Sequence, residues 1–494
     1  MAVVSGKSFN RSAAWIALAC LVVPMFASYY FDDMFSSISY LFENPALTQL
    51  GWDAAGYGLY TSGYSVLCVF GGLVVCGVLL DKWGVRITGS IFVGMMAAGA
   101  GLVLWALLSG SSASLTVAYV GCMFFGLGSE IAGTAVTRSI AKWFRGGPMA
   151  LAMGLQLAIA RLGTAFALVL SPILVRQQAG HVYTLAETAR PAVVGMGLMA
   201  LGLILWAFFV ALDARADRIE GKKVFPSAKK IADATGNTSF PSEQATEATD
   251  GMAGDKALSS AKKIADATES ALSPATTEAD KDEFRMKDVL GVLGNKNFWL
   301  LGLLCVLFYS SIIAFKKFAG AILIPRFDIP AEAAGWMVSM LPFSTVIFAP
   351  LFGMLVDKAG KGTRWMGLGA ILARIAHLLL AFAPAGVPFW GYLSMVFLGF
   401  GYSLVPAALW PSVPKIVPDK VLGTTFALIY WVQNLGLLSF KWLAGIILGK
   451  SADNGPVSVE LMFVGLCVAA VVVALLFRQT SARHPELQLD KANR

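Results

Sequence analysis

Glu130 and Arg161 have the side chains best placed for chemistry, because each lies deep in an apolar run long enough to cross a bilayer. At the 1.5 Å rise of an α-helix they lie roughly 18 Å and 21 Å from the flanking Lys142 and Gly147. Charges inside a membrane cost about 2.5–3.5 kcal/mol each on insertion scales, so they are functional candidates. A carboxylate accepts an ammonium group, and a guanidinium binds a carboxylate. The pair predicts a site for a small zwitterion, and a structural ion pair is the alternative.

Neutral polar residues at similar depth complete the predicted site. A weak internal repeat places Ser403 at the position of Glu130 and Asn434 at that of Arg161. Gln433, next to Asn434, offers a further amide for a peptide carbonyl or N–H. Aromatic residues on these runs serve packing more often than binding. Those we expect to line the cavity are Tyr60, Tyr64, Trp336 and Trp410.

A second group of charges lies further along three runs, roughly 28–32 Å from the side on which the chain begins. Its acids belong to the first half of the chain and its bases to the second half, which predicts ion pairs between the halves. Such pairs would form an outer gate, and unpaired side chains that reach the interface are the alternative. The group consists of Asp32, Asp33, Lys316, Lys317 and Lys441.

The composition of the 494 residues is that of a membrane protein. Hydrophobic residues make up 57% and charged residues 14%, and the mean hydropathy is +0.69. These values exclude a water-soluble enzyme and, for most of the chain, disorder. About twelve membrane-spanning helices are predicted. They cover Ala13–Tyr40, Ala54–Leu80, Ile87–Leu108, Leu115–Phe144, Pro148–Val175, Pro191–Ala211, Asn297–Pro325, Ala331–Val356, Trp365–Phe382, Pro388–Val413, Val421–Leu448 and Val457–Phe477.

The spans divide the chain into four parts. Residues 1–212 and 295–480 form two helical bundles, 213–294 a low-complexity linker, and 481–494 a tail. The linker repeats the sequence Ser-Ala-Lys-Lys-Ile-Ala-Asp-Ala-Thr, at Ser227–Thr235 and Ser260–Thr268, and is best explained as a tether. Lys and Arg concentrate in loops on one side, which places the linker and both termini in the cytoplasm.

The two bundles repeat a motif after their second helix. Gly77–Gly84 reads G-V-L-L-D-K-W-G, and Gly353–Gly360 reads G-M-L-V-D-K-A-G. With six helices in each half, the copies have the same membrane orientation. Parallel repeats of this kind are found in secondary transporters, whose sites lie at the repeat interface near the midplane.

This motif, with Arg86 just beyond its first copy, resembles the loop signature of the major facilitator superfamily. The resemblance implies an all-α membrane fold of two pseudo-symmetric six-helix bundles, transport by alternating access, no cofactor and a monomer. It also implies an inner gate at the loop positions. The residues concerned are Asp81, Lys82, Arg86, Asp357 and Lys358.

A narrower resemblance is to a dipeptide-transporting branch of that superfamily, and it implies facilitated diffusion (uniport) of dipeptides. The residues that carry it are Phe125–Glu130, Trp143, Phe144, Gly154–Leu157, Ala160–Gly163, Ala408–Pro411, Leu422–Thr424 and Gln433–Gly436.

Other functions are disfavoured. The chain lacks a Walker loop and the H-E-x-x-H and G-x-S-x-G motifs, and its cysteines lack metal-ligand spacing. The net charge of +8 fits membrane topology and contact with lipid rather than nucleic-acid binding. Two alternatives stay open: a proton-coupled carrier of organic anions or amino acids, and a transport-inactive receptor or scaffold.

Two further expectations concern the setting of the protein. The Asn-x-Ser/Thr acceptors, Asn10 and Asn237, fall on the predicted cytoplasmic side. This favours a bacterial inner membrane and does not indicate a glycosylated accessory subunit. His377 is predicted to be a helix-packing residue rather than part of a proton relay.

Overall fold

The computed structural model describes residues 11–42, 44–144, 148–178, 180–219, 291–417, 422–450, 455–487 and 489–491. These ranges are almost entirely helical, with one isolated β-bridge between Thr48 and Tyr183. The repeated linker segments and the first ten residues lie outside the described part, so the predictions made for them are not addressed.

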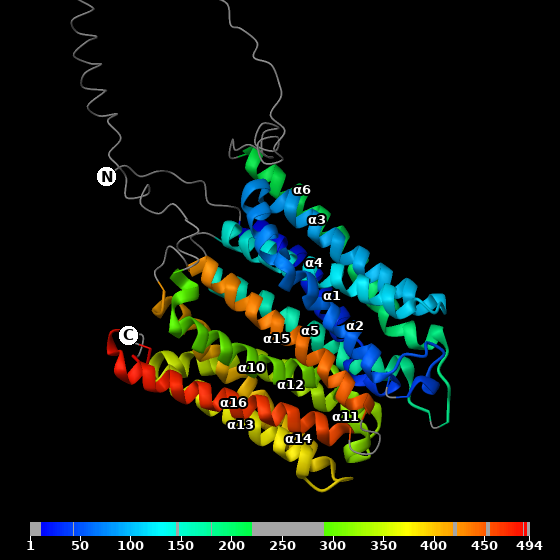
Figure 1. Ribbon diagram of the computed structural model, residues 1–494. Helices are drawn as coiled ribbons and strands as arrows, with labels where there is room; N and C mark the ends of the chain where they lie inside the picture. The colour runs from blue at the N-terminus through cyan, green and yellow to red at the C-terminus, as the bar shows by residue number, and fades with distance from the viewer. Residues whose placement is uncertain are drawn as a thin grey trace, which may run out of the picture.

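The helices form two bundles that correspond to the two halves of the sequence (Figure 1). The first bundle contains α1 (Arg11–Asp33), α2 (Ala54–Leu67), α3 (Leu73–Ser109), α4 (Ser114–Trp143), α5 (Met149–Val175) and α6 (Leu185–Ile219). The second contains α10 (Lys296–Lys317), α11 (Ala319–Phe327), α12 (Ala331–Ala359), α13 (Gly362–Phe382), α14 (Pro388–Leu409), α15 (Leu422–Lys450) and α16 (Gly455–Arg483). Short turns of helix are η1 (Ser36–Phe42), η2 (Pro45–Leu47), η3 (Cys68–Gly72), η5 (Trp410–Lys415) and η7 (Pro485–Leu487).

In the described part, 11 helices are long and apolar enough to cross a membrane, against about twelve predicted. The difference lies in the second predicted span. Its helix α2 is followed by the π-helical turn η3, and α3 then continues through the loop motif. Gly71 and Gly84 bend this segment with φ of +92° and +77°. Glycine adopts such left-handed values without the clash that a Cβ would cause.

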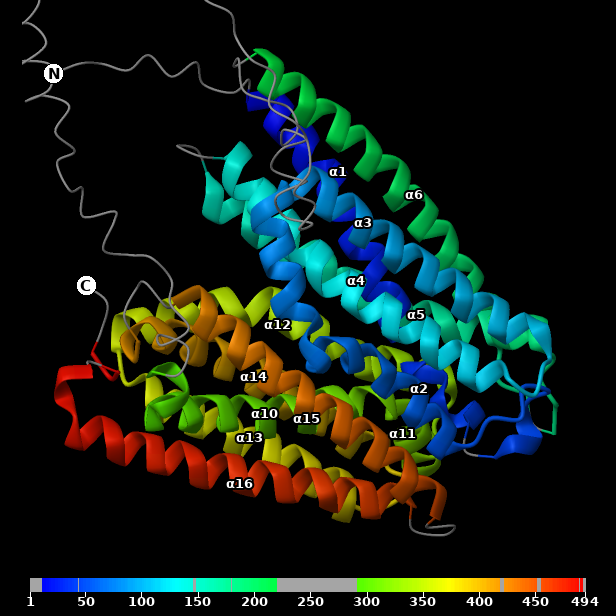
Figure 2. The ribbon, with the colours of Figure 1, turned by 45° about the horizontal axis from the view of Figure 1, so that its top comes forward.

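The first helix of each bundle is broken, although both were predicted as continuous spans. Helix α1 ends at Asp33 before η1, and α10 ends at Lys317 before α11. The pieces beyond the two breaks pack together, and a Cβ on Gly320 would lie 2.4 Å from the Ser37 carbonyl oxygen. We call this the gate end. The opposite end, which carries the start of α1 and the ends of α6 and α16, is the terminal end (Figure 2).

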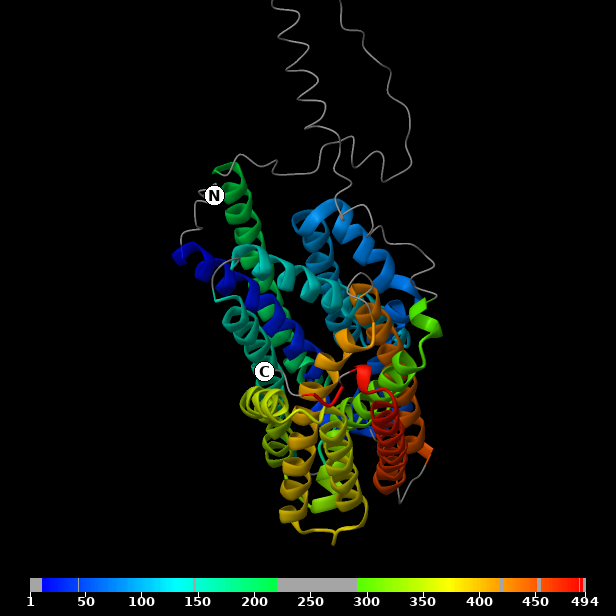
Figure 3. The ribbon, with the colours of Figure 1, turned by 90° about the vertical axis from the view of Figure 1, so that its left-hand side faces the viewer.

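Hydrogen bonds join the two bundles at the gate end. The Ser39 hydroxyl accepts a bond of 3.0 Å from the Ala321 amide, and the Gln177 side chain accepts one of 2.8 Å from the Ala331 amide. Toward the terminal end the ribbons of the two bundles diverge (Figure 2), and the view from that side shows them as two groups of helices (Figure 3). The molecule is therefore closed at the gate end.

Helix α6 runs past the predicted boundary at residue 212. Asp213 and Asp217 were assigned to the linker but lie in its last turns and are almost fully buried. Asp213 accepts hydrogen bonds from Arg86 at 2.7 Å and from Lys142 at 2.8 Å, and Asp217 contacts the same two cations. Composition alone misplaces the boundary, because charged residues continue a buried helix when cations pair with them.

Candidate functional site

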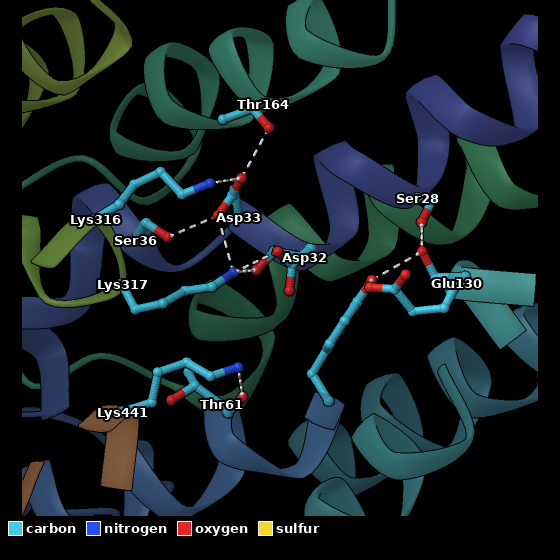
Figure 4. A network of polar contacts seen from close by, with 12 residues as sticks. Ser28, Asp32, Asp33, Ser36, Thr61, Glu130, Thr164, Lys316, Lys317 and Lys441 are labelled. Carbon is cyan, nitrogen blue, oxygen red and sulfur yellow. Dashed lines mark hydrogen bonds and ion pairs between the residues drawn. The ribbon is translucent and has the colours of Figure 1, made fainter. Parts of the chain in front are cut away.

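Asp33 forms the centre of the ion-pair cluster at the gate end (Figure 4). Its carboxylate lies 2.6 Å from the Lys316 ammonium and 2.8 Å from that of Lys317, and it accepts a 2.8 Å hydrogen bond from Thr164. Lys317 also lies 2.8 Å from Asp32. Four of the five residues predicted for the outer gate therefore meet across the bundles.

The helix breaks act on these charges in opposite ways. Asp33 ends α1, where the negative end of the helix dipole disfavours an acid. Lys316 and Lys317 end α10, where the same dipole favours a base. Lys317 and Asp33 are only 2% and 1% exposed, so each charge is compensated by the other rather than by water. Tyr57 on α2 adds a hydrogen bond of 2.9 Å to the Lys317 carbonyl.

Lys441 does not join the acids as predicted. Its ammonium donates a 2.7 Å hydrogen bond to the Thr61 carbonyl oxygen and lies 5.4 Å from the centre of the Tyr64 ring. The cause is close packing of α15 against α2, where a Cβ on Gly58 would lie 3.0 Å from the Lys441 carbonyl oxygen. This packing directs Lys441 toward the α2 backbone, beside the gate rather than within it.

Glu130 lies on α4 and is half-buried near the middle of the first bundle. The Tyr64 hydroxyl donates to its carboxylate at 3.2 Å. The neighbouring Ser129 shares a 2.6 Å hydrogen bond with Ser28 on α1. Since Tyr64 contacts both Glu130 and Lys441, it links the central site to the gate.

Arg161, on α5, reaches across to the second bundle. It donates a 2.9 Å hydrogen bond to the hydroxyl of Tyr402 on α14. Its guanidinium carbon lies 5.6 Å from the centre of the Tyr29 ring and 5.4 Å from that of Tyr402. Cation–π contacts of this kind stabilise a guanidinium while leaving N–H donors for an anion.

Glu130 and Arg161 form no direct ion pair, although both lie in the described chain and were predicted at similar depth in one site. Each contacts a tyrosine instead: Tyr64 at Glu130, and Tyr402 at Arg161. This geometry removes the alternative of a structural ion pair between α4 and α5. The two charges are separated, as the ends of a zwitterion are.

The neutral residues predicted for the site lie in the second bundle. Ser403 is fully buried and bonds only to the Gly399 carbonyl of its own helix in the described structure. The Gln433 side-chain oxygen accepts a hydrogen bond from the Cys305 thiol, with 3.6 Å between oxygen and sulfur. Asn434 donates to the Tyr430 carbonyl at 3.1 Å, and its side-chain oxygen has no hydrogen-bond partner in the described structure.

The four aromatic residues predicted to line the cavity lie in different surroundings. Tyr64 contacts Glu130 directly, whereas Tyr60 is buried in an aromatic cluster with Trp52 at the gate end. Trp336 is 55% exposed near the start of α12, away from the central charges. Trp410 is partly exposed and donates a 3.2 Å hydrogen bond to the Tyr309 hydroxyl.

Several residues of the central site were not predicted. They are Tyr29, Tyr309, Tyr402 and Tyr430. Tyr402 directly precedes Ser403, so the repeat had located its turn of helix but not the side chain that faces the site. For the others, aromatic residues in apolar helices carry no sequence signal that separates lining from packing.

Among the residues predicted for the inner gate, Arg86 has described ion pairs with Asp213 and Asp217, both in its own bundle. Asp357 and Lys358 are exposed at the end of α12. The side chains of Asp81 and Lys82 lie outside the part that the structure describes.

The second bundle contains a buried pair of polar residues, of which only one, His377, was singled out from the sequence. His377 on α13 shares a 2.7 Å hydrogen bond with Glu460 on α16, and both are fully buried. The pair joins α13 to α16, and the His377 Nε2 atom has no hydrogen-bond partner in the described structure. Glu460 was overlooked, although an acid inside a predicted span is itself a signal.

A family model described as Major Facilitator Superfamily matches residues 22–324 and 299–493. The chain belongs to this superfamily and is a membrane transporter, which confirms the fold and class predicted from the loop motif. It is similar to the lysosomal dipeptide transporter MFSD1 of Danio rerio, with 27% identity over 92% of this chain and 87% of that protein. The human MFSD1 is also 27% identical, over 89% and 80% of the two chains.

Solved structures share the fold. A mutant of the peptide transporter POT has a TM-score of 0.65 and 17% identity, covering 98% of this chain and 97% of the other. The xylose transporter XylE of E. coli, in an inward-open conformation, has a TM-score of 0.64 and 14% identity, covering 94% and 95%. At these identities the likeness establishes the fold alone.

Proposed function

We propose that this transporter carries dipeptides, with Glu130 holding the α-ammonium group and Arg161 the carboxylate. The observation that carries the proposal is the separation of these two charges, each contacted by a tyrosine and by no opposite charge in the described chain. A dipeptide supplies a group of opposite charge for each of these two residues, so the site stays neutral overall when substrate is bound. Asn434 offers an unpartnered oxygen for a peptide N–H. The lysosomal relatives named for dipeptide transport support this assignment.

We infer that the gate end is the outer side, closed by the Asp33 cluster, and that substrate reaches the site from the cytoplasm. The cation distribution along the chain supports cytoplasmic termini. The positions of Asn10 and Asn237 support a bacterial inner membrane. Fluorescent-protein fusions at both termini should fluoresce in a bacterial host, and periplasmic alkaline phosphatase activity at either terminus would contradict this orientation.

The experiment that tests the substrate is binding followed by flux. Dipeptides, but not single amino acids or small anions, should raise the thermal unfolding temperature of the purified protein, and the best of them should show counterflow in proteoliposomes. Glu130→Gln and Arg161→Lys should each lower uptake by at least about tenfold. Gln removes the negative charge that holds the ammonium group, and Lys, although cationic, cannot bind a carboxylate bidentately as Arg does. Arg190→Lys, an exposed change at the gate end, is the matched control.

The same assay distinguishes the remaining alternatives. We propose uniport, for which a dipeptide gradient alone drives flux. Concentrative uptake driven by a pH gradient would instead identify a proton-coupled carrier. Stabilisation by dipeptides without any counterflow would identify a transport-inactive receptor.

A further inference from the structure

A continuous group of aromatic side chains extends from Arg161 into the second bundle. Tyr402, which accepts the Arg161 hydrogen bond, packs on Tyr309 with 6.2 Å between ring centres. Tyr309 in turn accepts a hydrogen bond from Trp410, and Trp410 stacks on Tyr430 at 5.0 Å with an interplanar angle of 28°. Phe426 lies 5.9 Å from Trp410. We call these five residues the aromatic shelf.

The outer part of the shelf is accessible and lies next to the site. Tyr430 is 42% exposed and Trp410 is partly exposed, whereas Tyr309 and Tyr402 are buried beneath them. Tyr430 is connected through Trp410 and Tyr309 to Tyr402, which bonds to Arg161. Its helix also carries Asn434, whose unpartnered side-chain oxygen is almost fully buried.

The surroundings of Glu130 offer no comparable surface. Its neighbours Ser28 and Ser129 are small and bonded to each other. The Tyr64 ring packs against Phe125, with Lys441 over its face, so that ring is already occupied. The space beside an ammonium group at Glu130 is therefore lined by small or engaged side chains.

From this asymmetry we propose that the site distinguishes the two ends of its substrate: a dipeptide binds with its C-terminal side chain on the aromatic shelf, and an uncharged planar side chain is preferred there. This inference rests on the dipeptide function proposed above. Stacking between aromatic rings contributes about 0.5–1.5 kcal/mol beyond the area buried, which corresponds to roughly 2- to 13-fold in affinity. A cationic side chain is disfavoured, because the Arg161 guanidinium lies beside the shelf.

The test compares dipeptides that differ only in residue order. Ala-Phe and Phe-Ala have the same composition, charge and apolar area, so their affinity ratio isolates position in the site. We expect Ala-Phe to compete for counterflow about 2- to 13-fold more strongly than Phe-Ala, and more strongly than Ala-Arg. Replacing Tyr430 by Leu should bring the order ratio close to one, whereas Tyr430→Phe, which keeps the ring, should preserve it.

The outcomes are separable. Equal or reversed affinity of Ala-Phe and Phe-Ala for the wild-type protein, or a preference for Ala-Arg over Ala-Phe, overturns the inference while leaving the dipeptide function intact. If neither order binds or exchanges, the proposed function itself fails, and the inference with it. Thermal unfolding of the ligand-free Tyr430→Leu protein establishes that the variant is folded, and an order ratio unchanged in a folded Leu variant also overturns the inference.

Discussion

At the scale of single residues, the buried charges fall into two kinds. Those at the gate end, such as Asp33 and Lys317, compensate each other across the two bundles. Those at the centre, Glu130 and Arg161, have only neutral partners in the described chain. A buried charge with a fixed partner stabilises one conformation, whereas a charge lacking one favours a ligand of opposite sign. In the function proposed above, the same residue types therefore serve as a gate in one layer and as a binding site in the next.

Replacing Asp33 by Asn should destabilise the protein strongly. The change leaves the buried Lys316 ammonium facing a neutral amide and leaves Lys317 with Asp32 as its remaining acid. Breaking a buried ion pair costs about 3–5 kcal/mol. Thermal unfolding of the purified protein measures the loss. Asp328→Asn is the control, because that carboxylate is exposed at the same end. If both variants unfold at the wild-type temperature, the cluster does not hold the gate end closed.

At the scale of helices, close approach of α2 and α15 depends on two glycines. A Cβ on Gly445 would lie 2.4 Å from the Ala54 carbonyl oxygen and 2.9 Å from the Gly58 Cα. Real Cβ atoms do not come this close, so only glycine allows the two backbones to pack here. This contact also directs Lys441 on α15 toward the backbone of α2.

We expect Gly445→Ala to force α2 and α15 apart and to destabilise the closed gate by about 1–3 kcal/mol, as overpacking does. Gly465→Ala on α16 is the matched control, since a Cβ there meets nothing within 4 Å. That control should gain up to about 1 kcal/mol from helix propensity. Thermal unfolding compares the two, and an equal effect of both substitutions would show that the α2–α15 contact is not tight.

A second feature at this scale is a helix cap supplied from far along the chain. Helix α13 lacks a side-chain cap from its own N-cap residue, Lys361. Asp490 in the C-terminal tail accepts hydrogen bonds of 2.9 Å from the Thr363 amide and from Ser481. Its carbonyl also accepts one of 2.8 Å from the Lys361 amide. The tail therefore holds the start of α13, directly after the second copy of the loop motif.

Asp490→Ala should remove this cap and lower the free energy of unfolding by about 0.5–2 kcal/mol. The amides of residues 361–366 should exchange faster with deuterium than in the wild type. Lys491→Ala, next to it and exposed, should leave both quantities unchanged. Wild-type exchange in the Asp490 variant would mean that the tail contact does not persist in solution.

At the scale of the whole molecule, the structure shows one state of a two-bundle carrier, closed at the gate end by contacts between the bundles. Alternating access requires this end to open, and the Asp33 cluster must then separate. Holding it together should stop transport without unfolding the protein.

Cysteines placed at Asp33 and Lys317, in a background without the native cysteines, should be joined by a short cleavable thiol crosslinker. We expect the joined protein to lose dipeptide counterflow and to recover the flux of the untreated double variant after cleavage. Each single-cysteine variant treated in the same way controls for modification alone. Full transport in the crosslinked protein would exclude this cluster as a moving gate.

Much of the fold followed from local sequence patterns. Apolar runs identify spanning helices because a bilayer requires every backbone polar group to be satisfied within the segment. The repeated loop motif, Gly77–Gly84 and Gly353–Gly360, indicated two bundles of equal orientation. The boundary of α6 and the breaks after Asp33 and Lys317 were not predictable in the same way, because burial of paired charges and packing between bundles decide them.

The order of residues along the chain was enough to show which charges lie in the membrane and at what depth, because helical rise converts residue number into distance along the bilayer normal. Which of these charges meet depends on the fold. It brought Asp33 to Lys316 and Lys317, directed Lys441 to α2, and separated Glu130 from Arg161. The physical reason is that rotation of a helix and its distance from other helices depend on side-chain packing between segments far apart in the chain.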